Sequence, residues 1–265
     1  MMLRTGDIFS GESHDDYEVG IEIGRGGFGV VHLCTRMSDQ RDFVCKSPTG
    51  SESIKQKKIK SELKILKDLE NKGICNVVRA IELGNFEHDG KSIPVLIMEK
   101  VEGDTLNRVL KDPQTAEDTK NILLVVAKCL EKIHEAGYIH RDIKPENIMV
   151  NPSSTGYDIT VIDLGIAAVK EDQHTFALTS SIAATPFYAP PEQSKGTVSI
   201  GNDIFGLGAT GYYLLIGNEK CKIDANNNIA LPYDPRNHLG NITGEVGHLF
   251  NVICKATQRK RQDRF

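Results

Sequence analysis

The chain has 265 residues, a formal net charge of -4 and 39% hydrophobic residues, so it is long enough for two modest lobes or one large domain with a substantial core. The slightly acidic balance argues against a protein that binds nucleic acid as a whole, and the longest apolar run, ILLVVA at 122–127, is too short to cross a bilayer. Its six cysteines form no CxxC pair, which argues against a zinc site or a disulfide framework and predicts reduced thiols in a cytoplasmic protein.

A glycine-rich segment at 17–36 predicts a hairpin. Alternate residues from Tyr17 to Ile23 are apolar, which indicates a strand, and the β-branched run VVHLCTR at 30–36 indicates a second one. The pattern GxGxxG at 24–29 lies between them, and no helix pattern follows it, as a Rossmann turn would require. A glycine-rich tip can bring backbone N–H groups against phosphates because no Cβ blocks the approach. The alternative is that the glycines serve only the geometry of the turn.

The next segment, IKQKKIKSELKILKDLENKG at 54–73, predicts an amphipathic helix that ends at Gly73. Glu62 shares the edge of its apolar stripe, where a carboxylate is costly unless a cation meets it. The strand-like FVCKS at 43–47 offers Lys46 as that cation. Two interpretations remain open from geometry alone: Glu62 pairs with a buried lysine, or it is an exposed rim residue of a lysine-rich helix. The apolar positions of the stripe are Ile59, Leu63, Leu66 and Leu69.

A strand followed by a short connector is predicted at 92–104, SIPVLIMEKVEGD, and the connector at 99–103 is a candidate hinge. Beyond it the pattern becomes helical. One long helix is predicted at 119–137 and a second, largely buried helix at 202–217. Asn, Pro and Gly accumulate at 218–245, which predicts a surface loop with room for one short helix.

The segment YIHRDIKPENIMV at 138–150 brings together side chains of complementary chemistry. Pro145 interrupts a helix, so Asp142, Lys144 and Asn147 are expected on a loop. The acid can accept a proton from a hydroxyl group, the lysine can neutralise a phosphoryl group in transfer, and the amide can hold a metal ion.

Asp163 follows the β-branched run TVI and precedes a glycine, so a carboxylate is expected at the end of a strand. Such a group is a natural magnesium ligand beside phosphates. Taken singly, each of these residues has a plain structural alternative: His140 as a satisfied core histidine, Arg141 with Asp142 as an ion pair, and Asp163 as part of a turn.

The order of these pieces resembles the protein kinases of the eukaryotic type. The matching segments are GRGGFGVV, FVCK, KSELKIL, HRDIKPEN, DLG, ATPFYAPPE and DIFGLG, and the resemblance extends from about Tyr17 to Phe265. It implies an α+β, bilobal protein-kinase-like fold with a small β-rich N-lobe containing one main helix and a larger, mostly helical C-lobe.

The expected boundaries are an N-terminal extension at 1–16, an N-lobe at about 17–98, a hinge at 99–103 and a C-lobe at 104–265 that is truncated at its end. Arg264 stands where the family has an arginine that pairs with the glutamate of its Ala-Pro-Glu motif, here Glu192.

The resemblance also implies ATP as cofactor, with Mg²⁺ as the metal and Mn²⁺ as an alternative. Lys46 would hold the α- and β-phosphates and pair with Glu62. Asp142 would orient the substrate hydroxyl and accept its proton, Lys144 would steady the γ-phosphate, and Asn147 with Asp163 would bind the metal.

The implied catalytic set is Asp142, Lys144, Asn147 and Thr185, and the implied metal ligands are Asn147 and Asp163. Lys144 and Thr185 also indicate protein substrates with serine or threonine and not tyrosine. The adenine would lie between two valines and Met149, next to the backbone of the hinge. The implied nucleotide-binding set is Ile23, Gly24, Arg25, Gly26, Gly27, Phe28, Gly29, Val31, Val44, Lys46, Glu62, Met98, Glu99, Val101 and Met149.

Some positions depart from the usual family pattern. DLG replaces Asp-Phe-Gly, PPE at 190–192 replaces Ala-Pro-Glu, Ala184 stands where glycine is common, and Val44 replaces a common alanine, which narrows the expected adenine slot. None of these changes removes a catalytic group. The sequence pattern suits a bacterial kinase as well as a eukaryotic one.

The polar segment between Asp163 and Glu192 is expected to regulate activity through autophosphorylation. In the family, an arginine at the position of Arg141 marks kinases whose loop is ordered by a phosphate. The second basic residue that often supports this contact is replaced here by Ala168. The candidate acceptors are Thr179, Ser180 and Ser181.

Two other functions remain as alternatives. The first is a small-molecule kinase of the aminoglycoside or choline type, which generally lacks the glycine-loop pattern and the TPFYAPPE segment. The second is a pseudokinase that acts as a binding scaffold, whose usual mark is the loss of a residue equivalent to Lys46, Asp142 or Asp163; all three are present.

Overall fold

The computed structural model of the chain describes residues 3–27, 29–49, 53–154, 156–164, 167–169, 187–217 and 244–265. The chain divides into two compact units, one formed by Met1–Val101 with Asp163–Gly165 and the other by Glu102–Ile162 with Ile166–Phe265. The boundary between Val101 and Glu102 falls within the predicted connector at 99–103. No helix in the described part of the chain is long and apolar enough to cross a membrane.

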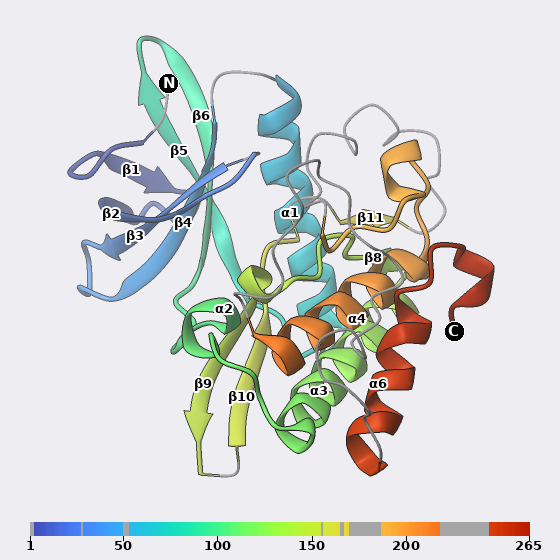
Figure 1. Cartoon of the computed structure of the whole chain (residues 1–265). Helices are drawn as coiled ribbons and strands as arrows, with labels where there is room; N and C mark the ends of the chain where they lie inside the picture. Colours follow the sequence, from blue (N-terminus) through green and yellow to red (C-terminus); the bar gives the residue numbers. More distant parts are fainter. Residues whose placement is uncertain are drawn as a thin grey trace, which may run out of the picture. The chain divides into compact units, whose positions relative to one another are not determined.

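The first unit contains a six-stranded antiparallel sheet that closes on itself in the order β1-β2-β3-β4-β6-β5 (Figure 1). The predicted glycine hairpin is confirmed, because Gly24 pairs with Val31 and Arg25 with Val30 on either side of its tip. Apolar side chains from all six strands, among them Tyr17, fill the interior of the sheet. The strands are β1 (Ile8–Gly11), β2 (Asp16–Arg25), β3 (Gly29–Arg36), β4 (Asp42–Pro48), β5 (Ala80–His88) and β6 (Lys91–Glu99).

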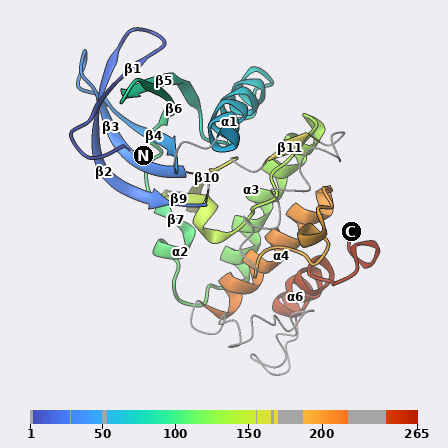
Figure 2. The same ribbon diagram turned by 90° about the horizontal axis from the view of Figure 1, so that it is seen from above.

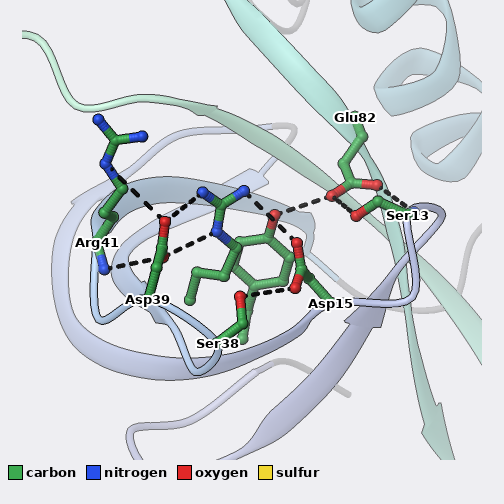
Figure 3. A network of polar contacts seen from close by, with 8 residues as sticks. Ser13, Asp15, Ser38, Asp39, Arg41 and Glu82 are labelled. Carbon is green, nitrogen blue, oxygen red and sulfur yellow. Dashed lines mark hydrogen bonds and ion pairs between the residues drawn. The ribbon is translucent and has the colours of Figure 1, made fainter.

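Strand β1 closes the sheet with residues that the sequence suggested as an N-terminal extension. It pairs with β2 on one side and with β5 on the other. Glu82 on β5 fastens the end of this strand, because its carboxylate accepts hydrogen bonds from the Ser13 N–H at 2.6 Å, the Ser13 hydroxyl at 2.7 Å and the Tyr17 hydroxyl at 2.8 Å (Figure 3). Since Phe9 also stacks on Tyr17 at 5.4 Å between ring centroids, this segment is part of the core and the sheet.

A second set of polar contacts holds the turn between β3 and β4 against the N-terminal segment. Arg36 bonds to Asp39 at 2.6 Å and lies 3.5 Å from Asp15, whose other oxygen accepts from the Ser38 hydroxyl at 2.7 Å. The Arg41 N–H donates to Asp39 at 3.2 Å (Figure 3). These contacts tie the turn between β3 and β4 to the residue before β2, at the end of the sheet opposite the glycine-rich tip.

Helix α1 (Ser53–Asn71) lies beside this sheet and packs on β4, β5 and β6 (Figure 2). The predicted helix and its stop are confirmed: Gly73 has a φ of 71°, a left-handed conformation that glycine adopts without strain. Ile59, Leu66 and Leu69 are buried as the periodicity predicts. The helix thus presents one face, including Glu62, to the strand that carries Lys46.

The second unit is mostly helical, and its helices α3, α4 and α6 pack against one another (Figure 1). Both long helices predicted from periodicity are confirmed. Its elements are β7 (Asp104–Thr105), α2 (Leu106–Val109), α3 (Ala116–Glu135), β8 (Tyr138–Ile139), β9 (Ile148–Ser153), β10 (Gly156–Val161), β11 (Ala168–Val169), α4 (Ile200–Ile216) and α6 (Gly244–Ala256), with 3-10 helices at Pro145–Asn147, Gln193–Lys195 and Arg261–Asp263.

Helix α4 is the centre of this unit, and almost every residue along it is buried. Its glycines cost helix stability, but several of them have a packing reason, and that of Gly206 concerns the site. A Cβ on Gly206 would stand 2.6 Å from the carbonyl oxygen of Ile143, so only glycine lets α4 approach the loop that carries Asp142 this closely. Most of the loop predicted at 218–245 lies outside the described residues.

Candidate active site

Lys46 is at the centre of a buried ionic group in the first unit. Its Nζ donates to the two carboxylate oxygens of Glu62 at 2.8 and 2.7 Å and to Asp163 Oδ1 at 2.7 Å. The side chains of Lys46 and Glu62 are only 6% and 1% exposed, whereas that of Asp163 is 46% exposed. Of the two interpretations of Glu62, the buried pair is therefore correct.

Electrostatics keep this lysine charged. Burial alone lowers the pKa of Lys46, but the carboxylates of Asp163 and Glu62 outweigh it, so the pKa is raised above its usual value. Burial raises the pKa of Glu62, and the nearby Lys46 ammonium opposes that rise. The result is a fixed positive charge with one fully buried partner and one partner open to solvent.

The same face of the sheet carries the apolar residues predicted to contact adenine. Val31 is paired with Lys46 across β3 and β4, and Val44 is paired with Met98 across β4 and β6. Directly paired residues in a sheet point to the same side, and so do alternate residues of one strand, which places these side chains on one face. Glu99 at the end of β6 accepts a hydrogen bond from the Arg79 N–H at 3.0 Å.

The glycine-rich tip does not need most of its glycines for backbone geometry. Gly24, Gly26, Gly27 and Gly29 all lie outside the left-handed φ region. A Cβ would meet nothing within 4 Å at Gly26 or Gly27 among the described residues, whereas at Gly29 it would lie 3.0 Å from the Ser47 carbonyl oxygen and 3.2 Å from the side chain of Lys46. Gly29 therefore allows close packing on the lysine, and the others leave the surface of the tip bare.

In the second unit, the structure brings the three predicted loop residues together. Asp142 Oδ2 lies 2.8 Å from Lys144 Nζ and accepts a hydrogen bond from Asn147 Nδ2 at 2.9 Å. Asn147 Nδ2 also donates to the Asp142 carbonyl at 2.8 Å, which fixes the backbone of the loop. The 3-10 helix that begins at Pro145 turns the chain back so that a residue five positions on can reach the aspartate.

Comparison with protein families matches residues 17–261 to the family described as "Protein kinase domain". The chain belongs to this family. A probable serine/threonine-protein kinase PknB of Corynebacterium glutamicum is 32% identical over 210 residues, which are 77% of this chain and 32% of that protein. Serine/threonine-protein kinase PknB of Mycobacterium tuberculosis is 27% identical over 261 residues, which are 95% of this chain and 41% of that protein. The chain thus spans well under half the length of these relatives.

Asp203 is the residue of this kinase domain whose role sequence reasoning missed. It is fully buried in α4, and its carboxylate accepts from the backbone N–H groups of His140 at 2.9 Å and Arg141 at 2.6 Å. His134 Nε2 also lies 2.7 Å from it. The sequence feature that could have revealed this role is a carboxylate in an otherwise apolar helix, because a buried carboxylate needs hydrogen-bond partners.

His140 and Arg141 serve the loop in different ways. His140 is fully buried, and its ring nitrogens lie 3.2 Å from the Ile162 carbonyl and 3.3 Å from the Asp142 N–H, as expected of a satisfied core histidine. Arg141 is buried in a left-handed conformation with a φ of 71°. Burial lowers the pKa of its guanidinium, while the charge of Asp203 opposes that effect.

The ion pair expected between Arg264 and Glu192 in the kinase domain is confirmed. The guanidinium donates through Nη1 to Glu192 Oε1 and through Nη2 to Oε2 at 3.1 Å. It also lies over the ring of Phe205, 5.0 Å from the centroid. The C-terminal end of the chain is thus bonded to the end of the PPE motif.

Several predicted positions lie outside the described residues: Phe28, Ala184, Thr185 and the hydroxyl residues at 179–181. Of the remaining nucleotide-binding positions, Arg25 is paired with Glu22 on the surface, and Met149 lies on β9 opposite Thr105.

Proposed function

We propose that this chain is an ATP-dependent serine/threonine protein kinase, which transfers the γ-phosphoryl group of ATP to hydroxyl groups of protein substrates. The observation that carries the proposal is the loop in which Lys144 and Asn147 both contact the carboxylate of Asp142. The match to the protein kinase domain over residues 17–261 and the names of its relatives support protein substrates with serine or threonine over small molecules.

The glycine-rich tip and Lys46 are the proposed phosphate site. The bare backbone at Gly26 and Gly27 leaves room for phosphate oxygens to approach N–H groups. Lys46 keeps its charge through Glu62 and would meet the α- and β-phosphates as a point charge. The face that carries Val31 and Val44 is the proposed adenine surface, together with Ile23, Met98 and Met149.

Asn147 and Asp163 are the proposed magnesium ligands. Both offer the oxygen donors that Mg²⁺ prefers: Asn147 uses its Nδ2 on Asp142 and would offer its side-chain Oδ1 to a metal, and Asp163 is half-exposed. The described residues contain no cluster of three His, Cys, Asp or Glu that could hold a metal alone, which fits an ion held partly by nucleotide phosphates. Bound there, the ion would neutralise charge that develops on the phosphoryl oxygens.

Transfer would then follow from the groups around Asp142. Its carboxylate accepts the proton of the substrate hydroxyl as that oxygen bonds to the γ-phosphorus, and the bond from this phosphorus to the bridging oxygen breaks to leave ADP. Lys144 offsets charge on the transferring group, and its contact with Asp142 at 2.8 Å keeps the carboxylate oriented. Thr185 is proposed to contact the same pair.

The test is phosphoryl transfer by the purified chain from ATP and magnesium to a generic protein substrate, with sites mapped by mass spectrometry. Asp142→Asn and Asp163→Asn should each lower turnover by at least about 100-fold, because both stand where charge develops. Asp158→Asn is the matched control, since this aspartate is exposed on β10. Near-normal turnover in either active-site variant would contradict the assignment. Transfer only to small molecules, or no turnover at all, would favour the two alternatives.

A further inference from the structure

Gln193 is a buried glutamine directly after the PPE motif, and both ends of its amide are used. It opens the 3-10 helix Gln193–Lys195 and is 1% exposed. Its Nε2 donates to the Arg141 carbonyl at 2.8 Å, and its Oε1 accepts from Asn202 Nδ2 at 2.7 Å. The residue therefore joins the start of α4 to the residue that precedes the catalytic aspartate.

The partner of this amide is a strained backbone. Arg141 has a φ of 71°, a conformation that costs a residue with a Cβ free energy and that persists only where its surroundings hold it. Its N–H donates to Asp203 Oδ1 at 2.6 Å, and its carbonyl accepts from Gln193. The peptide that joins Arg141 to Asp142 is thus held at its carbonyl by the glutamine at 2.8 Å and, by a longer bond of 3.3 Å, at its N–H by His140 Nδ1. Rotation of this peptide would redirect the Asp142 side chain.

Asn202 determines which end of the glutamine amide faces Arg141. Its Oδ1 accepts from the Ser199 N–H at 2.7 Å, as part of the capping box of α4, so its Nδ2 is directed to Gln193. Only an oxygen of Gln193 can accept from that donor, which leaves the nitrogen for the Arg141 carbonyl. The chain of hydrogen bonds from Ser199 through Asn202 and Gln193 to Arg141 therefore has one allowed orientation of its amides.

We propose that Gln193 is a positioning residue that holds the Arg141 carbonyl and thereby orients Asp142 for transfer. The neighbouring Glu192 is bonded to Arg264, so consecutive residues anchor the end of the PPE segment and the catalytic loop. The inference rests on the proposed kinase function but concerns a residue that contacts neither ATP nor substrate in that proposal.

The first experiment compares Gln193→Met with Gln114→Met. Methionine keeps the length of glutamine and removes both hydrogen bonds. Gln114 is the matched control because its Nε2 also donates to a backbone carbonyl, that of Asp112, at 2.7 Å. We expect Gln193→Met to lower kcat about 10- to 100-fold, as misplaced catalytic groups do, with an unchanged KM for ATP. The control should match wild type in both. Wild-type kcat in Gln193→Met, or equal losses in the two variants, would overturn the proposal.

The second experiment uses Gln193→Glu, which retains the shape of glutamine. A protonated carboxyl group can both donate to Arg141 and accept from Asn202, whereas a carboxylate cannot donate. Its activity relative to wild type should therefore exceed that of Gln193→Met at about pH 6, where more of the buried carboxyl group is protonated, and should fall as the pH rises to about 8. Equal activity of the two variants throughout this range would overturn the proposal, because loss of packing alone has no such pH dependence.

A third measurement separates this inference from the proposed function. Hydrogen exchange of the Arg141 and Asp142 amides, measured by NMR on the unliganded chain, should accelerate about tenfold or more in Gln193→Met while amides of α3 keep their wild-type rates. If the wild type transfers no phosphate, the proposed function fails while this measurement still reports on the loop. Unchanged exchange at both amides would overturn the positioning role.

Discussion

Replacing Lys46 by methionine removes the cation from a buried carboxylate and retains most of the side-chain volume. Glu62, with its side chain 1% exposed, would then keep the hydrogen bond from the Leu164 N–H but face the carboxylate of Asp163 without a cation between them. Asp163 loses the same partner, but it is 46% exposed and stays solvated. The stability of the variant therefore depends on Glu62, which can avoid an uncompensated charge only by taking up a proton.

The free energy needed to protonate Glu62 sets how much stability the variant loses. An unfolded glutamate has a pKa of about 4.3, and each pH unit above it adds about 1.4 kcal/mol to the free energy of protonating the carboxylate. Keeping Glu62 neutral therefore costs roughly 3.7 kcal/mol at pH 7 and about 1 kcal/mol at pH 5. The folded pKa of Glu62 in this variant is raised above its unfolded value. The stability contribution of the protonated form is thus fully present below the unfolded pKa and is lost as the pH rises. We expect Lys46→Met to be destabilised by these amounts relative to wild type.

The assay is urea unfolding of both proteins at pH 5, 6 and 7, followed by circular dichroism. The double variant Lys46→Met/Glu62→Leu should remove the pH dependence, because no buried acid remains. Lys72→Met is a control directly after the same helix, since its pair with Asp68 of that helix is on the surface, and it should change stability by less than about 1 kcal/mol. A loss in Lys46→Met that stays constant across this pH range would refute the reasoning.

Two further predictions follow from the connector and the polar segment. Gly103→Ala should lower the free energy of unfolding by roughly 2 kcal/mol or more, because Gly103 has a φ of 95° and a Cβ would stand 2.2 Å from the Val150 carbonyl oxygen. Gly137→Ala, with a φ of 91° and open space, should lose only about 1 kcal/mol in the same unfolding assay; equal losses would contradict the steric argument. Joint replacement of the hydroxyl residues at 179–181 by alanine should lower transfer to an external substrate about tenfold or more, if phosphate there orders the catalytic site. Undiminished transfer, in protein first shown to carry phosphate at those positions, would mean that the phosphate is incidental.

The sequence predicted the elements and residue groups whose interactions are local. Periodicity was sufficient for α1, α3 and α4, since the apolar stripe of a helix repeats within a few residues. Asp142 and Asn147 are five positions apart, so a loop that folds back must bring them close. The position of Pro145 made that loop predictable.

The tertiary structure alone decided whether Glu62 was buried, which residues hold Asp142 in place, and where the N-terminal residues lie. Glu62 is at the edge of a stripe, and only the packing of α1 on β4 turns that edge toward Lys46. Asp203 and Gln193 contact a loop more than 50 positions away in sequence, through backbone groups that have no sequence signature. Residues 8–11 have too short a pattern to predict a strand, and they form one because β2 and β5 offer unpaired edges. In each case the outcome depends on the free-energy cost of burying polar groups without hydrogen-bond partners, and those partners come from segments distant in the chain.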